Sequence, residues 1–79
     1  MKIGDKVRFA RNFPLVNITT ETTGVVLELA TVSTLDFLIL VNNYVRTPYS
    51  TRPFVPSYVP DKLKNSCIYV SPRNLEVIE

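Results

Sequence analysis

The side chains that most often carry out catalysis are few in this sequence of 79 residues, and they stand apart from one another. Histidine is absent, so the side chain best suited to proton transfer near neutral pH is missing. The two glycines, Gly4 and Gly24, are too far apart to form a phosphate-binding loop. The carboxylates also occur singly: Asp5, Glu21, Glu28, Asp36, Asp61, Glu76 and Glu79. This pattern predicts a protein that is not an enzyme and that holds no metal or other cofactor.

Cys67 is the one cysteine, and its surroundings allow two interpretations. Lys64 lies three residues before it and would lower the thiol pKa, which is a feature of reactive cysteines. The alternative is a small core residue at the start of a strand, because a buried free cysteine behaves as a small apolar side chain. The second interpretation is favoured.

The segment 42–60 combines aromatic, basic and proline residues, with four prolines, three tyrosines and two arginines and no acid. Prolines at this spacing exclude a long helix and a central strand. Disordered segments are usually poor in aromatic and β-branched residues, so we expect an ordered flap that packs across the preceding strand. Phe54 or Val55 would be its inward anchor.

The wider insertion, residues 42–66, also carries most of the positive charge. It holds four basic side chains against one acid, a balance of +3, whereas the whole chain has a net charge of +2. Tyrosine and arginine are favoured at protein–protein contacts, and the same pair stacks on bases and binds phosphates in single-stranded nucleic acid. The predicted partner-binding residues are Tyr44, Arg46, Tyr49, Arg52, Tyr58, Lys62 and Lys64, of which Tyr49, Arg52 and Tyr58 are expected to be exposed.

The low net charge favours a protein partner over a nucleic acid, because phosphate contacts dominate nucleic-acid affinity and usually require a clearer basic excess. We therefore expect a binding or adaptor module that acts through protein–protein contact, such as a small accessory or phage-type regulatory protein of a nucleic-acid machine. The alternative is a domain that binds RNA or DNA directly through the basic and aromatic insertion.

Short strands must position this insertion, since β-branched and aromatic residues dominate and helix signals are almost absent. The apolar runs predict five strands, at 6–10, 21–29, 36–45, 67–70 and 75–78. The run at 37–41 is apolar on both faces, which predicts cover on both sides, by the core and by the insertion. Alternation along the strands predicts the core residues Val7, Phe9, Val25, Leu27, Leu38, Leu40, Ile68, Val70, Leu75 and Val77.

Turn residues separate these strands. The residues 2–5 predict a turn, and Gly24 suits a tight bend or a bulge near the start of its strand. Residues 11–19 predict a long, partly apolar loop. Ser71 and Pro72 have the types expected at the N-cap and first position of a single helical turn.

Three stretches resemble SH3-like small β-barrels of the KOW and Tudor-like group. These are GDKVRF at the first strand, TGVVLEL at the second, and VSPRNLEVI, which resembles the strand, 3₁₀ turn and final strand that end many such barrels. The resemblance implies an all-β, five-stranded barrel in one domain, residues 1–79, with the insertion between the third and fourth strands. Such barrels serve RNA-binding, transcription-factor and adaptor proteins, so the frame alone does not select a function.

The single cysteine fits a reducing compartment, and the first residues lack the apolar run of a signal peptide. The longest apolar run, at 37–41, is too short to span a membrane. The sequence therefore predicts a cytoplasmic protein without a membrane partner.

Overall fold

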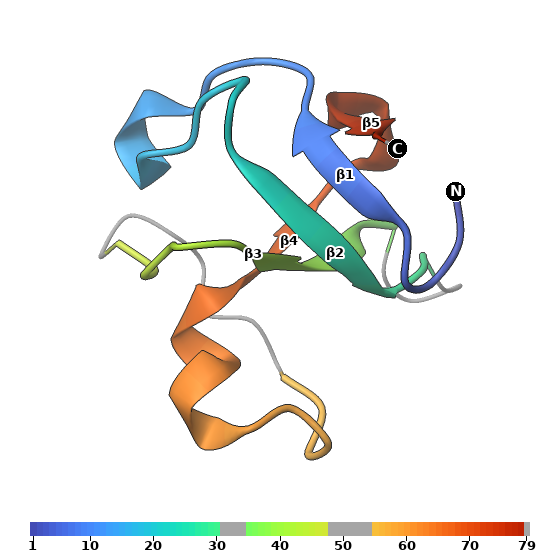
Figure 1. The fold of residues 1–79 in the computed structure, drawn as a ribbon, viewed down its shortest axis with the longest axis vertical. Helices are drawn as coiled ribbons and strands as arrows, with labels where there is room; N and C mark the ends of the chain where they lie inside the picture. Colours follow the sequence, from blue (N-terminus) through green and yellow to red (C-terminus); the bar gives the residue numbers. More distant parts are fainter. Residues whose placement is uncertain (31–34, 48–54, 79) are drawn as a thin grey trace.

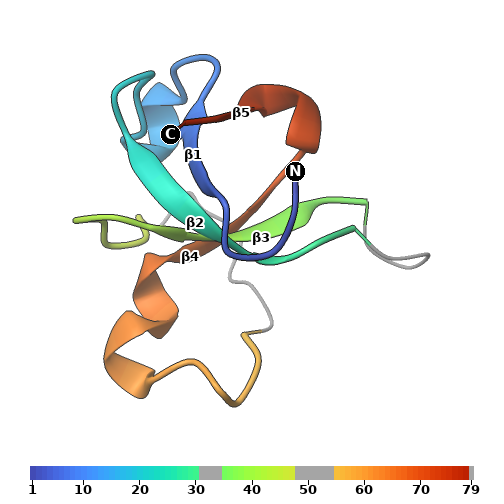
Figure 2. The same ribbon diagram turned by 45° about the vertical axis from the view of Figure 1, so that its right-hand side comes forward.

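The computed structural model describes residues 1–30, 35–47 and 55–78. Five short strands form one antiparallel sheet in the order β4-β3-β2-β1-β5 (Figures 1 and 2). The strands are β1 (Lys6–Phe9), β2 (Thr23–Glu28), β3 (Phe37–Val41), β4 (Cys67–Val70) and β5 (Leu75–Val77). The described residues also form three 3₁₀ helices: η1 (Pro14–Val16), η2 (Asp61–Ser66) and η3 (Pro72–Asn74).

The all-β prediction is confirmed, and so are five strands and the helical turn before the last of them. β4 and β5 are the two ends of the sheet and do not pair in the described part of the chain, so the sheet is not closed. A closed barrel is therefore not confirmed. η2 was missed, because it begins directly after the proline-rich segment 42–60 and no helical pattern marks its residues.

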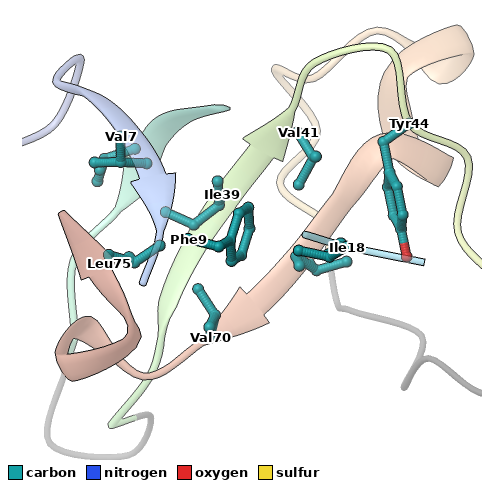
Figure 3. Close-up of a cluster of buried hydrophobic side chains, with 10 residues drawn as sticks. Val7, Phe9, Ile18, Ile39, Val41, Tyr44, Val70 and Leu75 are labelled. Atoms are coloured by element: carbon teal, nitrogen blue, oxygen red, sulfur yellow. The ribbon is translucent and has the colours of Figure 1, made fainter. Parts of the chain in front are cut away.

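The inner cluster, a group of buried side chains from all five strands, fills the concave side of the sheet (Figure 3). Ile18 and Tyr44 join it from the two long connections. The turn before β1 is bound to β2, because the Gly4 N–H donates to the Val26 carbonyl at 2.8 Å. The members of the inner cluster are Val7, Phe9, Ile18, Val26, Ile39, Val41, Tyr44, Ile68, Val70 and Leu75.

The outer cluster lies on the opposite face of β3 and β4. Its fully or almost fully buried members are Leu38, Cys67 and Val59, and Val59 comes from the insertion. Four partly buried side chains pack against them: Leu27, Leu40, Val55 and Leu63. β3 is thus covered on both faces, as its sequence predicted, and the described part of the insertion supplies the second cover.

Part of the predicted core was assigned to the wrong face. Leu27, Leu38 and Leu40 belong to the outer cluster, Val25 is only partly buried, and Val77 is 49% exposed. The inner positions of these strands are instead Val26, Ile39 and Val41. β3 is apolar at every position, so no polar residue marks its outer face. In β2 the polar marker was Glu28, but the register shift between Val26 and Glu28 breaks the alternation that linked it to Val26. The remaining predicted core residues, Val7, Phe9, Ile68, Val70 and Leu75, are confirmed.

Gly24 does not form the predicted bend or bulge, but allows the neighbouring strands to approach closely. It is paired with both Val7 and Val41, and a Cβ there would lie 2.7 Å from Ile39 Cγ2 and 2.7 Å from the Leu40 carbonyl oxygen. Only glycine permits this close approach of strands. The register shift of β2 occurs further along, between Val26 and Glu28.

Candidate contact surface

The structure describes five of the seven predicted contact residues, and these five differ in exposure and in their partners. Tyr49, Arg52 and the expected anchor Phe54 lie outside the described residues. Tyr44 is 7% exposed and belongs to the inner cluster, where its hydroxyl donates to the Val16 carbonyl at 2.6 Å. Burial raises the pKa of this hydroxyl, although the backbone of Thr47 and the Arg46 charge act in the opposite direction. The structure therefore gives Tyr44 a role in packing.

Tyr58 is exposed, as predicted, with 61% of its surface accessible. Its hydroxyl lies 3.1 Å from Glu28 Oε1 and 3.5 Å from the Leu27 carbonyl oxygen, so it holds the insertion against β2. Partial burial and then the Glu28 carboxylate raise the pKa of this hydroxyl.

The basic residues of the insertion are partly engaged within the molecule. Lys64 forms an ion pair with Asp61, with Nζ and Oδ1 2.9 Å apart. The backbone N–H of Arg46 donates to the Asn65 carbonyl at 2.6 Å, which places this segment beside the end of η2. Lys62 is exposed on η2. A carboxylate thus stands among the lysines of η2.

Two other exposed apolar side chains lie on segments that the fold brings side by side. Leu15 on η1 is 72% exposed and Val45 is 74% exposed. Their segments adjoin because the Tyr44 hydroxyl bonds the Val16 carbonyl and Thr47 Oγ1 lies 3.3 Å from the Leu15 carbonyl oxygen. Both segments lie on the same side of the molecule in Figures 1 and 2. We call Leu15 and Val45, together with η1 and residues 44–47 that carry them, the η1 surface.

An apolar hollow of about 390 Å³ lies on one side of this surface, lined by residues 11–16. Arg11 covers part of it, with its guanidinium carbon 4.8 Å from the centre of the Phe13 ring. The ring of Phe13 also meets Phe9 edge to face, with centroids 6.2 Å apart, so the wall of the hollow is anchored in the inner cluster.

A polar hollow of about 330 Å³ adjoins this surface through Val45, which is one of its lining residues. Its walls come from the end of the first long loop, the start of β2 and the turn that follows β3. The lining residues are Asn17, Thr19, Glu21, Thr22, Thr23, Asn42, Asn43, Tyr44 and Val45.

The sequence contained only a weak signal for this surface. Leu15 lies in a loop that was expected to be partly apolar, and Val45 was placed at the end of a strand. β3 instead ends at Val41, because Asn43 adopts a left-handed conformation (φ 54°) that turns the chain. The contact between the two loops depends on long-range hydrogen bonds that no local pattern encodes.

The remaining chemistry of the described residues is modest. Cys67 is fully buried, with Sγ 3.6 Å from the Leu63 carbonyl oxygen, and burial raises its pKa. This confirms the prediction of a core cysteine. Within ranges 1–30, 35–47 and 55–78, no three histidine, cysteine or acidic side chains gather as a metal site would require. The same ranges contain no helix that is long and apolar enough to cross a membrane.

Comparisons with known proteins found no match: no protein-family model matches the sequence, and neither the curated proteins nor the solved structures give a significant match.

Proposed function

We propose that this chain is a non-enzymatic binding module that contacts a protein partner through the η1 surface. The observation that carries the proposal is the pair of large apolar side chains, Leu15 and Val45, exposed on adjoining segments. Exposed apolar residues scattered singly need no explanation, but a group of them beside a hollow is typical of an interaction site.

The surface is also held in place before any partner arrives. The Phe13 and Ile18 backbones bond to each other at 2.7 and 3.2 Å, and Tyr44 and Thr47 bond to the loop between them. A contact surface that is already ordered loses less conformational freedom on binding, so more of the contact energy contributes to affinity. Complete burial of a leucine or valine side chain contributes about 1.5–3 kcal/mol.

The proposal includes an SH3-like frame. Its support is the strand order, a long connection between β1 and β2, and the 3₁₀ turn η3 between β4 and β5. These agree with the resemblance of the first, second and last strands. In this frame the η1 surface is formed by the two longest connections, which is where a rigid scaffold usually carries its binding residues.

Direct nucleic-acid binding is the rival function, and the geometry of the insertion disfavours it. Glu28 bonds to the Tyr58 hydroxyl, and Asp61 pairs with Lys64. Both carboxylates would stand near the phosphates of a nucleic acid bound to these residues. Phosphate binding would also weaken steeply between about 50 and 200 mM salt.

The test is affinity capture from the native host with three forms of the protein: the natural chain, Leu15→Ala and Leu35→Ala. Leu35 is a matched control, because it is also an exposed leucine (80%) but lies before β3. We expect the natural chain and Leu35→Ala to retain the same protein after nuclease treatment, and Leu15→Ala to lose it.

Equal capture by all three forms would remove the η1 surface from the proposal. Loss of the partner with nuclease, together with a steep salt dependence of oligonucleotide binding, would establish the rival function.

A further inference from the structure

We propose that the polar hollow beside Val45 binds the positively charged end of an arginine or lysine side chain from the partner. This inference rests on the proposed protein-binding function and specifies the chemistry that the partner must carry. Val45 belongs both to the apolar pair and to the lining of the hollow. A partner that covers Val45 therefore brings its neighbouring side chains to the hollow.

Two asparagines of the lining share an unusual backbone conformation. Asn17 (φ 57°) and Asn43 (φ 54°) are the described non-glycine residues with positive φ, and both line the hollow. Asparagine tolerates this region better than most residues, so the conformation alone is explained by the two turns. Glycine would serve each turn at least as well. The two turns therefore do not require the amide side chains, and these can be removed by glycine without changing the backbone conformation.

The side chains of Asn17, Asn43 and Glu21 make no hydrogen bond or ion pair within the described part of the chain, so their oxygens are available to a ligand. The other polar groups of the wall are already bonded. Asn42 Nδ2 donates to Thr23 Oγ1 at 2.9 Å, and the Thr19 N–H donates to Thr22 Oγ1 at 3.0 Å. These bonds fix the wall around the three available groups.

The charge of the wall selects the ligand. Glu21 is the acidic residue among the lining residues, and no lysine or arginine lines the hollow. An anion would meet a carboxylate without a compensating cation. A guanidinium or ammonium group carries donors only, and it matches a carboxylate and two amide oxygens. Hydrogen bonds between charged partners are also about twice as strong as neutral ones.

A sugar is the other ligand that amides and hydroxyls commonly hold, and the structure disfavours it. Sugar sites usually add an exposed aromatic face, but the Tyr44 ring in this wall is 7% exposed and its hydroxyl is bonded to Val16. The volume of about 330 Å³ is ample for the end of one long side chain.

The experiment uses two synthetic peptides that differ in one side chain of similar size and shape: acetyl-Val-Arg-Leu-amide, and the same peptide with neutral citrulline in place of arginine. Binding is followed by NMR through the side-chain amide signals of Asn17 and Asn43. We expect the arginine peptide to shift these signals and to bind about tenfold more tightly than the citrulline peptide. Glu21→Gln should reduce this preference to near unity.

Asn43→Gly separates binding from folding, because it keeps the left-handed turn and removes the amide. We expect an unchanged melting temperature and a reduced preference for arginine. Leu15→Ala should weaken both peptides equally, since it affects the apolar contact and not the charge. A failure of the proposed η1 surface would therefore appear as normal binding by Leu15→Ala, whatever the hollow does.

Three results would overturn the inference. They are equal affinity for the two peptides, an unchanged preference in Glu21→Gln, and larger shifts of the two amide signals with methyl β-glucoside than with the arginine peptide. The last result would assign the hollow to sugars.

Discussion

The two faces of β3 are covered in different ways. The inner cluster is built mainly by strands that are hydrogen-bonded to one another, with Val7, Val26 and Ile39 completely buried. The outer cluster is closed by Val55, Val59 and Leu63, which belong to a loop and a 3₁₀ helix of the insertion. Burial is equally complete at its centre, since Leu38 and Cys67 are 0% exposed.

The difference lies in what holds each cover in place. Opening the inner cluster requires the separation of paired strands, whereas opening the outer cluster requires only the departure of residues 55–66. The cover is held by apolar contacts, the Tyr58–Glu28 bond and bonds at the end of η2, such as Ser66 Oγ to the Tyr44 carbonyl at 2.6 Å. Regions with few backbone bonds to the rest of the fold open at lower free energy than the whole protein. We expect the outer cluster to open locally and the inner cluster to open only when the protein unfolds.

The largest expected effect is at the centre of the inner cluster. Phe9 is 1% exposed, and Phe9→Ala should lower the free energy of unfolding by about 3–5 kcal/mol, because a cavity remains. A chain of this length has a total stability of roughly 4–12 kcal/mol, so this loss removes at least about a quarter of it. Chemical denaturation followed by circular dichroism measures the loss. A smaller loss than that of Val59→Ala would contradict the dominance of the inner cluster.

Gly24→Ala tests how closely the strands approach beneath that cluster. The added methyl group would meet Ile39 Cγ2 and the Leu40 carbonyl oxygen, both at 2.7 Å. The side chain has some freedom to rotate away, but the backbone oxygen moves only with β3. We expect a loss of about 1–3 kcal/mol in the free energy of unfolding, which is the usual cost of overpacking. Unchanged stability in thermal melts would show that β2 and β3 are further apart than the structure places them.

The same comparison explains how far the sequence predicts the fold. β1 and β4 alternate between apolar and exposed or small residues, and their inward faces were predicted correctly at Val7, Phe9, Ile68 and Val70. β3 is apolar at every position, so alternation identified a strand with two covers but not which residues face which cover. Its phase is set by pairing with β2 and by the fit against Gly24, and both are tertiary effects.

The candidate surface was less accessible to prediction. Aromatic and basic composition drew attention to the insertion, yet Tyr44 is buried and Lys64 is paired with Asp61. Leu15 and Val45 carry no distinctive pattern of their own. Their proximity follows from hydrogen bonds between segments about thirty residues apart, such as Thr47 to Leu15.

Val59→Ala should loosen the outer cluster without unfolding the protein. Val59 is 4% exposed, and removing two buried carbon atoms should cost about 1.5 kcal/mol. Cys67 beneath it reports the opening, because a thiol reagent reaches Sγ only when residues 55–66 move away. We expect the labelling rate of Cys67 under native conditions to rise about tenfold.

Val45→Ala is the matched control, because this valine also belongs to the insertion but is 74% exposed. Its stability should change by no more than about 0.5 kcal/mol and its labelling rate should stay the same. If Cys67 in the natural chain is labelled only as fast as global unfolding allows, the two clusters open together and the proposed difference between them is wrong.

The smallest expected effect is a difference in response to alkali. Burial raises the pKa of the Cys67 thiol above its ordinary value of 9.0, and it raises the pKa of Tyr44 in the inner cluster above 10.0. Each group therefore stays protonated in the folded protein at a pH where it has begun to ionise in the unfolded chain. Its contribution to stability is intact below its ordinary pKa and is lost as the pH rises through the raised value.

Because the ordinary pKa of the thiol is the lower of the two, stability should begin to fall near pH 9 in the natural chain. In Cys67→Ala the fall should begin closer to pH 10. Denaturation curves of both proteins between pH 7 and 10.5 measure this difference. Hydrogen exchange below pH 9 measures the local opening of the outer cluster before the thiol ionises, and serves as the reference. Identical pH profiles would show that the thiol ionises without opening the outer cluster, and that the cover formed by residues 55–66 admits water to Cys67.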